Sequence, residues 1–219
     1  MTWLCKSNGS VNRHFWTSET GTRILIDPYD KLLGYKMPKP IAADIVAVTH
    51  NHGDHNKIHV ASGNYLLVNE PKEYSHDDVF IKGFKTYHDK VNGKKRGNNI
   101  VFRFVVDGLT IVHCGDLGHL LTADQIRDIG KVDILMIPVG GKMTLSGVDA
   151  AQVMNQLHPT VTIPMHYRTK ALSFLGMLMF EKVDRFIEAS GERSSEMRVL
   201  DVNKNNLSQY SGIVTLQYQ

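Results

Sequence analysis

Four potential metal ligands within six residues constrain this chain more than any other feature. They are His50, His52, Asp54 and His55, and they follow directly after the apolar run 45–48. This run is rich in β-branched residues, which favour the extended geometry of a strand. Because residues i and i+2 of an extended chain point the same way, the first two histidines can bind one ion together. The glycine that follows permits a sharp turn with unusual backbone angles, which would aim the other two ligands elsewhere. The motif therefore predicts a metal site, with room for a second ion.

The pattern His-x-His-x-Asp-His at a strand end resembles the signature of the metallo-β-lactamase fold superfamily. The order of the downstream elements is similar to that of its Zn-dependent hydrolase branch, which is related to the ascorbate-6-phosphate lactonases. The resemblance covers nearly the whole chain, from 23–28, which looks like the family's early strand ending in Asp-Pro, to 163–167. It implies a four-layer αββα sandwich in which residues 1–219 form one domain. The hydrophobic pattern alone predicts only a mixed α/β domain.

The family pattern implies three further ligands downstream. The third motif is a histidine at a strand end, and the chain offers two candidates, His88 and His113. His88 precedes a Gly- and Lys-rich turn and then a strand-like run, as the family's third motif does, so it is the predicted ligand. Asp116 follows a glycine and fits the fourth motif, and His166 fits the fifth. The implied assignment places His50, His52 and His88 on the first metal, Asp54, His55 and His166 on the second, and Asp116 between both.

This ligand set predicts a hydrolase with two divalent ions. Neutral imidazoles and carboxylates suit Zn²⁺, and also Mn²⁺ or Fe²⁺, because no thiolate is assigned to the site. The predicted reaction is attack by a hydroxide that bridges the two metals, with Asp54 and Asp116 holding and orienting it. The expected substrate is a small anionic ester, lactone or phosphodiester. Two alternatives stay open: a di-iron redox protein on the same fold, and a metal-binding module without catalysis.

Substrate contacts are predicted from residues that flank the ligands. His113, His119 and Tyr167 lie within three residues of a predicted ligand, and Lys142 lies in a glycine-rich segment after a predicted strand. His113 has a second interpretation, as a residue that orients a ligand. Cys114 is interpreted as a small buried hydrophobe rather than a ligand.

A basic segment, 90–97, directly follows His88. Its Asn-Gly pair indicates a solvated hairpin tip, and the alternative is a positive rim that attracts an anionic substrate. One basic loop without interleaved aromatic residues is not a nucleic-acid-binding pattern.

Composition limits the remaining classes. The chain has 219 residues, of which 42% are hydrophobic, and this is enough for a sizeable core. Its two cysteines suit a reducing compartment, and without an apolar signal core near the start we expect a cytoplasmic protein. No apolar run is long enough to span a membrane, and 171–180 is interpreted as a loop or helix near the site mouth. A homo-oligomer is left open.

Secondary structure is predicted from periodicity and turn signals. Thr122 is the expected N-cap of a helix with Gln125 at the capping-box position, and Gly130 is its expected end. The predicted strands are 12–17, 23–27, 44–49, 65–68, 79–82, 84–88, 99–106, 109–113, 133–138 and 160–164. Further helices are predicted at 148–157 and 176–189, followed by strands within 197–218.

Overall fold

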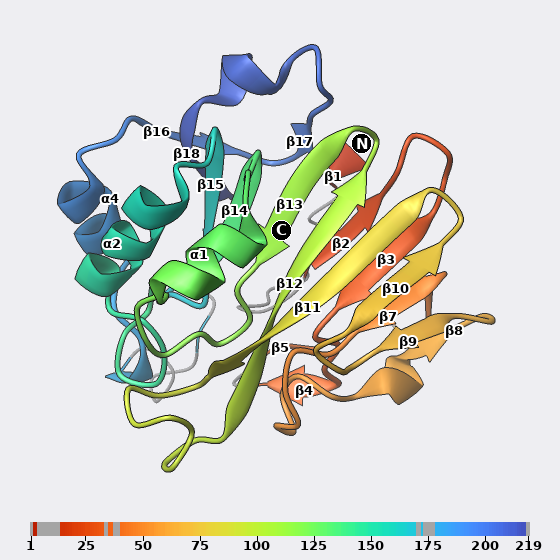
Figure 1. Ribbon diagram of the computed structural model, residues 1–219, viewed down its shortest axis with the longest axis horizontal. Helices are drawn as coiled ribbons and strands as arrows, with labels where there is room; N and C mark the ends of the chain where they lie inside the picture. The colour runs from red at the N-terminus through yellow and green to blue at the C-terminus, as the bar shows by residue number, and fades with distance from the viewer. Residues whose placement is uncertain are drawn as a thin grey trace.

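Two sheets packed face to face form the body of the protein (Figure 1). The structure, a computed structural model, describes residues 2–3, 14–32, 35–36, 40–169, 172 and 178–217. The six-stranded sheet has the order β17 (Leu200–Asp201), β1 (Thr2–Trp3), β2 (His14–Thr17), β3 (Arg23–Ile26), β7 (Ile45–Ala47) and β9 (Leu66–Val68). The eight-stranded sheet has the order β10 (Glu73–His76), β11 (Val79–Tyr87), β12 (Asn98–Val106), β13 (Leu109–His113), β14 (Ile134–Pro138), β15 (Val161–Met165), β18 (Gly212–Leu216) and β16 (Ser194–Met197).

Short elements complete the fold. Two small sheets pair β4 (Lys31–Leu32) with β5 (Tyr35–Lys36), and β6 (Ile41–Ala42) with β8 (Ala61–Ser62). The helices are α1 (Ala123–Ile129), α2 (Gly147–Leu157) and α4 (Asp184–Ser190), and the 3-10 turns are η1 (Ile58–Val60) and η2 (Leu207–Tyr210). None of the helices in the described part of the chain is long and apolar enough to cross a membrane.

The main core lies between the two sheets. Trp16 of β2 and Phe104 of β12 meet there edge to face, with ring centroids 5.0 Å apart. In β3, Ile24 and Ile26 belong to this core, whereas Leu25 between them belongs to a second apolar cluster. Successive side chains of a strand point to opposite faces, so the six-stranded sheet is buried on both sides. This explains why strands such as β3 are apolar at every inner position rather than at alternate ones.

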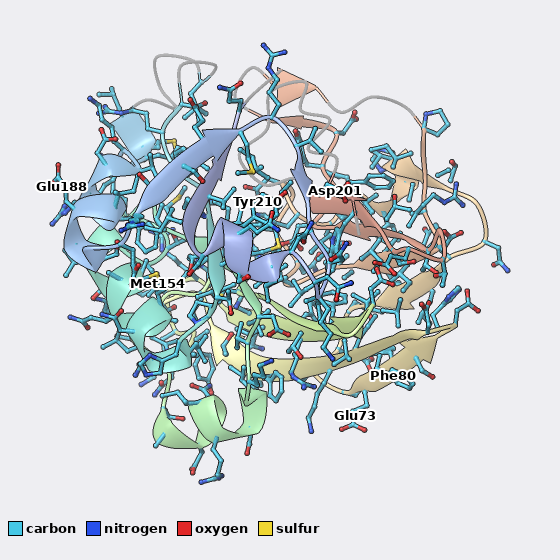
Figure 2. The ribbon with its side chains drawn as sticks, turned by 90° about the horizontal axis from the view of Figure 1, so that it is seen from above. Glu73, Phe80, Met154, Glu188, Asp201 and Tyr210 are labelled. Carbon is cyan, nitrogen blue, oxygen red and sulfur yellow. The ribbon has the colours of Figure 1, made fainter. Side chains whose placement is uncertain are left out.

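The helices cover the outer face of the eight-stranded sheet. Figure 1 shows α1, α2 and α4 beside β13, β14 and β15. In Figure 2, Met154 of α2 and Glu188 of α4 lie on the opposite side of the molecule from Glu73 of β10 and Phe80 of β11, which mark the other end of the same sheet. The predicted αββα sandwich is confirmed. Over the six-stranded sheet, the fourth layer is built in the described residues from shorter segments that bury Val60, Leu172 and Phe180 in the second cluster.

Two predicted boundaries are wrong for identifiable reasons. The strands expected at 79–82 and 84–88 are one strand, β11, in which Gly83 pairs with Phe102. A glycine is needed there because an added Cβ would lie 2.8 Å from the Glu70 carbonyl oxygen. The helix expected at 176–189 is interrupted before α4, because the backbone of Glu181 bonds to Gly140 and Arg168 instead.

Other local predictions are confirmed. Thr122 caps α1, its side chain and that of Gln125 form the capping box, and Gly130 ends the helix. Positions 12–13 of the first predicted strand, and part of the 171–180 and 176–189 segments, lie outside the described residues. The first and last parts of the described chain also meet, since Thr2 pairs with Asp201 where β1 and β17 run antiparallel.

Candidate metal centre

Strand direction brings the predicted ligands to one edge of the sandwich. β11 and β13 are both antiparallel to β12, and β13, β14 and β15 are parallel, so the carboxyl ends of β11, β13 and β15 lie at the same edge. His88, Asp116 and His166 follow those ends. The loop after β7 supplies His50 and His52 from the facing sheet. Stiff strands therefore fix the donors, while the loops leave one side open.

The geometric centre of the site is one carboxylate oxygen. The Oδ2 atom of Asp116 lies 3.1 Å from Nε2 of His88, 3.4 Å from Nε2 of both His55 and His166, and 3.8 Å from Nε2 of His50. All five side chains are buried. Imidazole lone pairs aimed at a carboxylate repel it unless protons or cations lie between them, so this arrangement is built for positive charge.

The first group of predicted ligands is His50, His52 and His88. One potential ligand atom from each lies within 4.8 Å of the others. The Thr49 hydroxyl donates its one proton to Asp27, so its oxygen accepts from Nδ1–H of His50 at 2.9 Å. Nε2 of His50 then carries a lone pair, and it is a buried atom without a hydrogen-bond partner among the described residues. Such an atom fits a metal ligand.

The second group is His55, Asp116 and His166, whose ligand atoms also lie within 4.8 Å of one another. Oδ2 of Asp54 lies 3.7 Å from Nε2 of His55, and the Asp54 side chain is 35% exposed. The structure thus brings all seven predicted ligands together, with Asp54 on the solvent side. Phe180 packs edge to face on His166, with ring centroids 4.8 Å apart, so this end of the 171–180 segment does lie beside the site.

Asp27 is a site residue to which the sequence analysis assigned no role. It lies just after β3 with φ of 49° and accepts hydrogen bonds from the Thr49 backbone and hydroxyl, both at 2.8 Å. Its Oδ2 lies 3.1 Å from Nδ1 of His55. Nε2 of His55 is thereby directed at Asp116, as expected for a carboxylate that orients a ligand. In the sequence, the signal that could have identified this residue is the Asp-Pro pair, Asp27 and Pro28, directly after the early strand.

Burial and neighbouring charge set the ionisation of the centre. Burial lowers the pKa of His50 to about 4, which keeps the imidazole neutral, as metal binding requires. Burial would also lower the pKa of His55, but the carboxylates of Asp116 and Asp27 outweigh it and raise that pKa to about 9. Burial opposes ionisation of Asp116 too, but His166 and His55 hold its pKa well below the usual value.

The turn that presents Asp116 is held by a buried amide. Oδ1 of Asn99 accepts from the Asp116 backbone N–H at 2.9 Å, and Nδ2 donates to the Cys114 carbonyl at 2.9 Å and to Thr86 at 2.8 Å. Gly115 has φ of 55°, and an added Cβ there would lie 2.5 Å from Oδ1 of Asn99. The turn therefore requires glycine at this position. Cys114 is fully buried with a free thiol whose pKa burial raises, as its interpretation as a hydrophobe predicts.

The four predicted substrate contacts lie in different environments. His113 is buried beneath the Asp116 turn, where Nδ1 accepts from the Gly115 backbone N–H at 3.1 Å, and burial lowers its pKa to about 4. This position matches the second interpretation of His113, in which it supports a ligand. Tyr167 is also buried. Substrate contact by either residue stays a prediction.

His119 and Lys142 are both engaged with backbone atoms. Nε2 of His119 accepts from the Tyr87 backbone N–H at 3.1 Å, so Nδ1 donates to the Leu120 carbonyl at 2.7 Å. The Lys142 ammonium donates to the Leu178 carbonyl. His119 thus ties the loop after Asp116 to the end of β11, next to ligand His88. Their contact with substrate likewise stays a prediction.

Comparisons with known proteins agree with this geometry. Residues 11–166 match the family model described as a beta-lactamase superfamily domain. A protein of Pelotomaculum thermopropionicum named UPF0173 metal-dependent hydrolase is 32% identical over 183 residues, which are 69% of this chain and 79% of that protein. The crystal structure of a candidate Zn-dependent hydrolase of the metallo-β-lactamase superfamily from Thermotoga maritima has 33% identity and a TM-score of 0.77, covering 94% of this chain and 95% of that one.

A more distant likeness concerns the fold alone. CmlA, a diiron β-hydroxylase from Streptomyces venezuelae, has a TM-score of 0.61 at 13% identity, covering 95% of this chain and 52% of that one. At this identity the likeness shows the fold alone. The family match and the nearer relatives are decisive: the chain belongs to the metallo-β-lactamase superfamily, and within it to the metal-dependent hydrolases.

Proposed function

We propose that this hydrolase cleaves a small anionic ester, lactone or phosphodiester with the help of two divalent metal ions. The observation that carries the proposal is the convergence of four imidazole Nε2 atoms on one oxygen of Asp116. The donors form two groups in which the ligand atoms lie within 4.8 Å of one another, His50, His52 and His88 in one and His55, Asp116 and His166 in the other. The proposed ligands are His50, His52 and His88 for the first ion, Asp54, His55 and His166 for the second, and Asp116 for both.

The chemistry of the donors supports this assignment. Imidazoles and carboxylates without a thiolate accept Zn²⁺, our first choice, and also Mn²⁺ or Fe²⁺. Bound there, two such ions would lower the pKa of a water shared between them toward neutrality and polarise the scissile group. The lone pair on Nε2 of His50 and the orientation of His55 by Asp27 prepare these side chains as ligands.

The two proposed catalytic carboxylates have different surroundings. Asp116 is buried and fixed by Asn99, so it holds the centre in one geometry. Asp54 is partly exposed and lies at the open side, with Oδ2 3.7 Å from His55. It is therefore placed to orient the attacking water and to accept its proton. Because both carboxylates are attached to strand ends or short turns, little reorganisation is needed on substrate binding.

The test is elemental analysis of protein purified without chelators. We expect about two equivalents of metal per chain, a large loss of metal and of turnover in His52→Ala and Asp116→Ala, and unchanged circular dichroism. The matched control is His59→Ala, because His59 is exposed and lies outside the ligand groups. Turnover is measured on a panel of lactones and phosphodiesters.

Three outcomes would contradict the proposal. Full activity in Asp116→Ala would remove the assigned role of that carboxylate. Iron with visible absorbance and no hydrolysis would favour the di-iron redox alternative. Failure of the wild-type protein to bind metal, with its stability unaffected by chelator, would leave a binding module as the better explanation.

A further inference from the structure

A cleft of about 670 Å³ opens beside the first group of ligands, and no role has yet been assigned to it. It reaches His50 and His52 and then extends away from the centre between the loops after β7 and β9 and the ends of β11 and β12. The lining residues that matter for ligand binding are Lys85, Arg96, Asn51, Asn56, Asn69 and Asn98.

The charge of this cleft is positive. Lys85 of β11 and Arg96 before β12 line it, and the lining residues that the structure describes include no carboxylate. Two cationic residues in the lining of one cleft raise the local concentration of anions, and the Lys85 ammonium also lies over the Tyr87 ring, 5.9 Å from its centroid. A dianion balances two positive charges better than a monoanion does, and a phosphate group carries a charge of about −1.5 to −2 near neutral pH.

The loop that carries Arg96 is held in a fixed shape. Asp89, next to ligand His88, accepts hydrogen bonds from the backbone N–H groups of Val91, Gly93, Lys95 and Arg96 at 2.8 to 2.9 Å. The Arg96 guanidinium also donates to the Lys142 carbonyl at 3.4 Å. The backbone beneath this cation is therefore preorganised rather than a loose hairpin tip.

Side-chain amides supply the remaining polarity of the cleft. Asn51, Asn56, Asn69 and Asn98 line it, and Nδ2 of Asn56 donates to Oδ1 of Asn51 at 2.6 Å. An amide both donates and accepts, so such a wall suits polar uncharged groups such as hydroxyls. Cations at one place and amides around them are the features of a site that orients a polar, charged ligand.

We propose that this cleft binds a dianionic group, of the phosphate type, on the part of the substrate that does not react. Lys85 and Arg96 contact the dianion, the asparagines contact the polar chain that follows, and the scissile bond lies at the His52 end. Lys85 and Arg96 are thus specificity-determining residues. The inference rests on the proposed hydrolase function and specifies which end of the substrate carries the charge.

The test compares three esters that share a 4-nitrophenyl leaving group. The acyl parts are butyrate, which is neutral, glutarate, which ends in a carboxylate, and 4-phosphonobutyrate, whose phosphonate cannot be hydrolysed. In the metal-loaded wild-type protein we expect kcat/KM to be at least about tenfold higher for the phosphonate ester than for butyrate. Tenfold corresponds to about 1.4 kcal/mol, which is within what one hydrogen bond to a charged group contributes.

Matched variants locate the effect. In Lys85→Gln and Arg96→Gln the preference for the phosphonate ester should fall toward one while the metal content is retained. Lys94→Gln and Lys95→Gln remove cations from the same loop, but both side chains are exposed and outside the lining, so the preference should stay. An unchanged preference in the first pair overturns the proposal. An equal preference for the glutarate ester overturns its dianion part.

Failure of the hydrolase proposal itself is distinguishable. If no ester is cleaved, calorimetric titration of the metal-loaded protein with free 4-phosphonobutyrate replaces the kinetic comparison. Binding that weakens about tenfold in Arg96→Gln and not in Lys94→Gln supports the cleft assignment while the hydrolase proposal fails. Absence of such Arg96-dependent binding overturns the cleft assignment as well.

Discussion

Replacing Asn99 by alanine tests how the Asp116 turn is held. Asn99 is fully buried, and its side chain bonds the Asp116 N–H, the Cys114 carbonyl and the Thr86 hydroxyl. Alanine leaves the buried Asp116 N–H without its partner, whereas the Cys114 carbonyl keeps the bond from the Leu117 N–H at 3.2 Å. One such unsatisfied group costs about 1–3 kcal/mol, so we expect a loss of about 1–3 kcal/mol in the free energy of unfolding. The neighbouring Asn98 is exposed, and Asn98→Ala serves as the matched stability control.

The assay is urea unfolding in the presence of chelator, so that metal affinity does not contribute to the free energy. Fluorescence of Trp16, which is buried between the sheets, reports the transition. Elemental analysis of the same variant without chelator should show reduced metal, since Asp116 is no longer fixed. The reasoning is refuted if Asn99→Ala unfolds within about 0.5 kcal/mol of the wild-type protein, the range of ordinary surface substitutions.

Two further predictions concern charge and close packing. Hydrogen bonds from Arg23 lower the pKa of Asp44 to about 2, so the pair stabilises the fold above about pH 4 and this contribution is lost as pH falls from about 4 to 2. Asp44→Asn should lower the free energy of unfolding by about 1 kcal/mol at pH 7, a small value because the pair is partly exposed. The same substitution should flatten the pH dependence of the unfolding free energy between about pH 4 and 2. An unaltered pH profile would contradict this prediction. Gly118→Ala would place a Cβ 2.4 Å from the His88 carbonyl carbon, so we expect lower metal occupancy by elemental analysis. The control is Gly53→Ala, in the ligand motif itself. It should keep its metal, because a Cβ at Gly53 would meet only a lysine side-chain atom at 4.0 Å. Metal loss in Gly53→Ala but not in Gly118→Ala would contradict this prediction.

The candidate metal ligands could be predicted from the sequence because their signal is local. Their identities depend on strand ends and short spacings, and the structure brings all seven together. Unusual backbone angles were also expected at Gly53, but this glycine does not have the positive φ seen at Gly115. In the later motif, Gly115 is sterically required. An added Cβ there would lie 2.5 Å from Oδ1 of Asn99, which belongs to another strand.

The supporting residues were not predictable in the same way. Asp27 acts on Thr49 and His55, and Asn99 acts on Asp116 across the sheet, so each role depends on contacts that only the fold creates. Tertiary contacts also explain the wrong helix at 176–189. Backbone bonds from Glu181 to Gly140 and Arg168 outweigh the helical pattern there.

The pairing of β1 with β17 has a consequence for synthesis. Thr2 and Asp201 are partners in one ladder although nearly the whole described chain lies between them. A ribosome adding about 5–20 residues per second needs roughly 10–40 s to supply the second strand after the first. The six-stranded sheet therefore acquires its final edge only after the loops of the candidate metal centre have been made. The proposed ligands emerge from the ribosome before the sandwich that fixes them is complete.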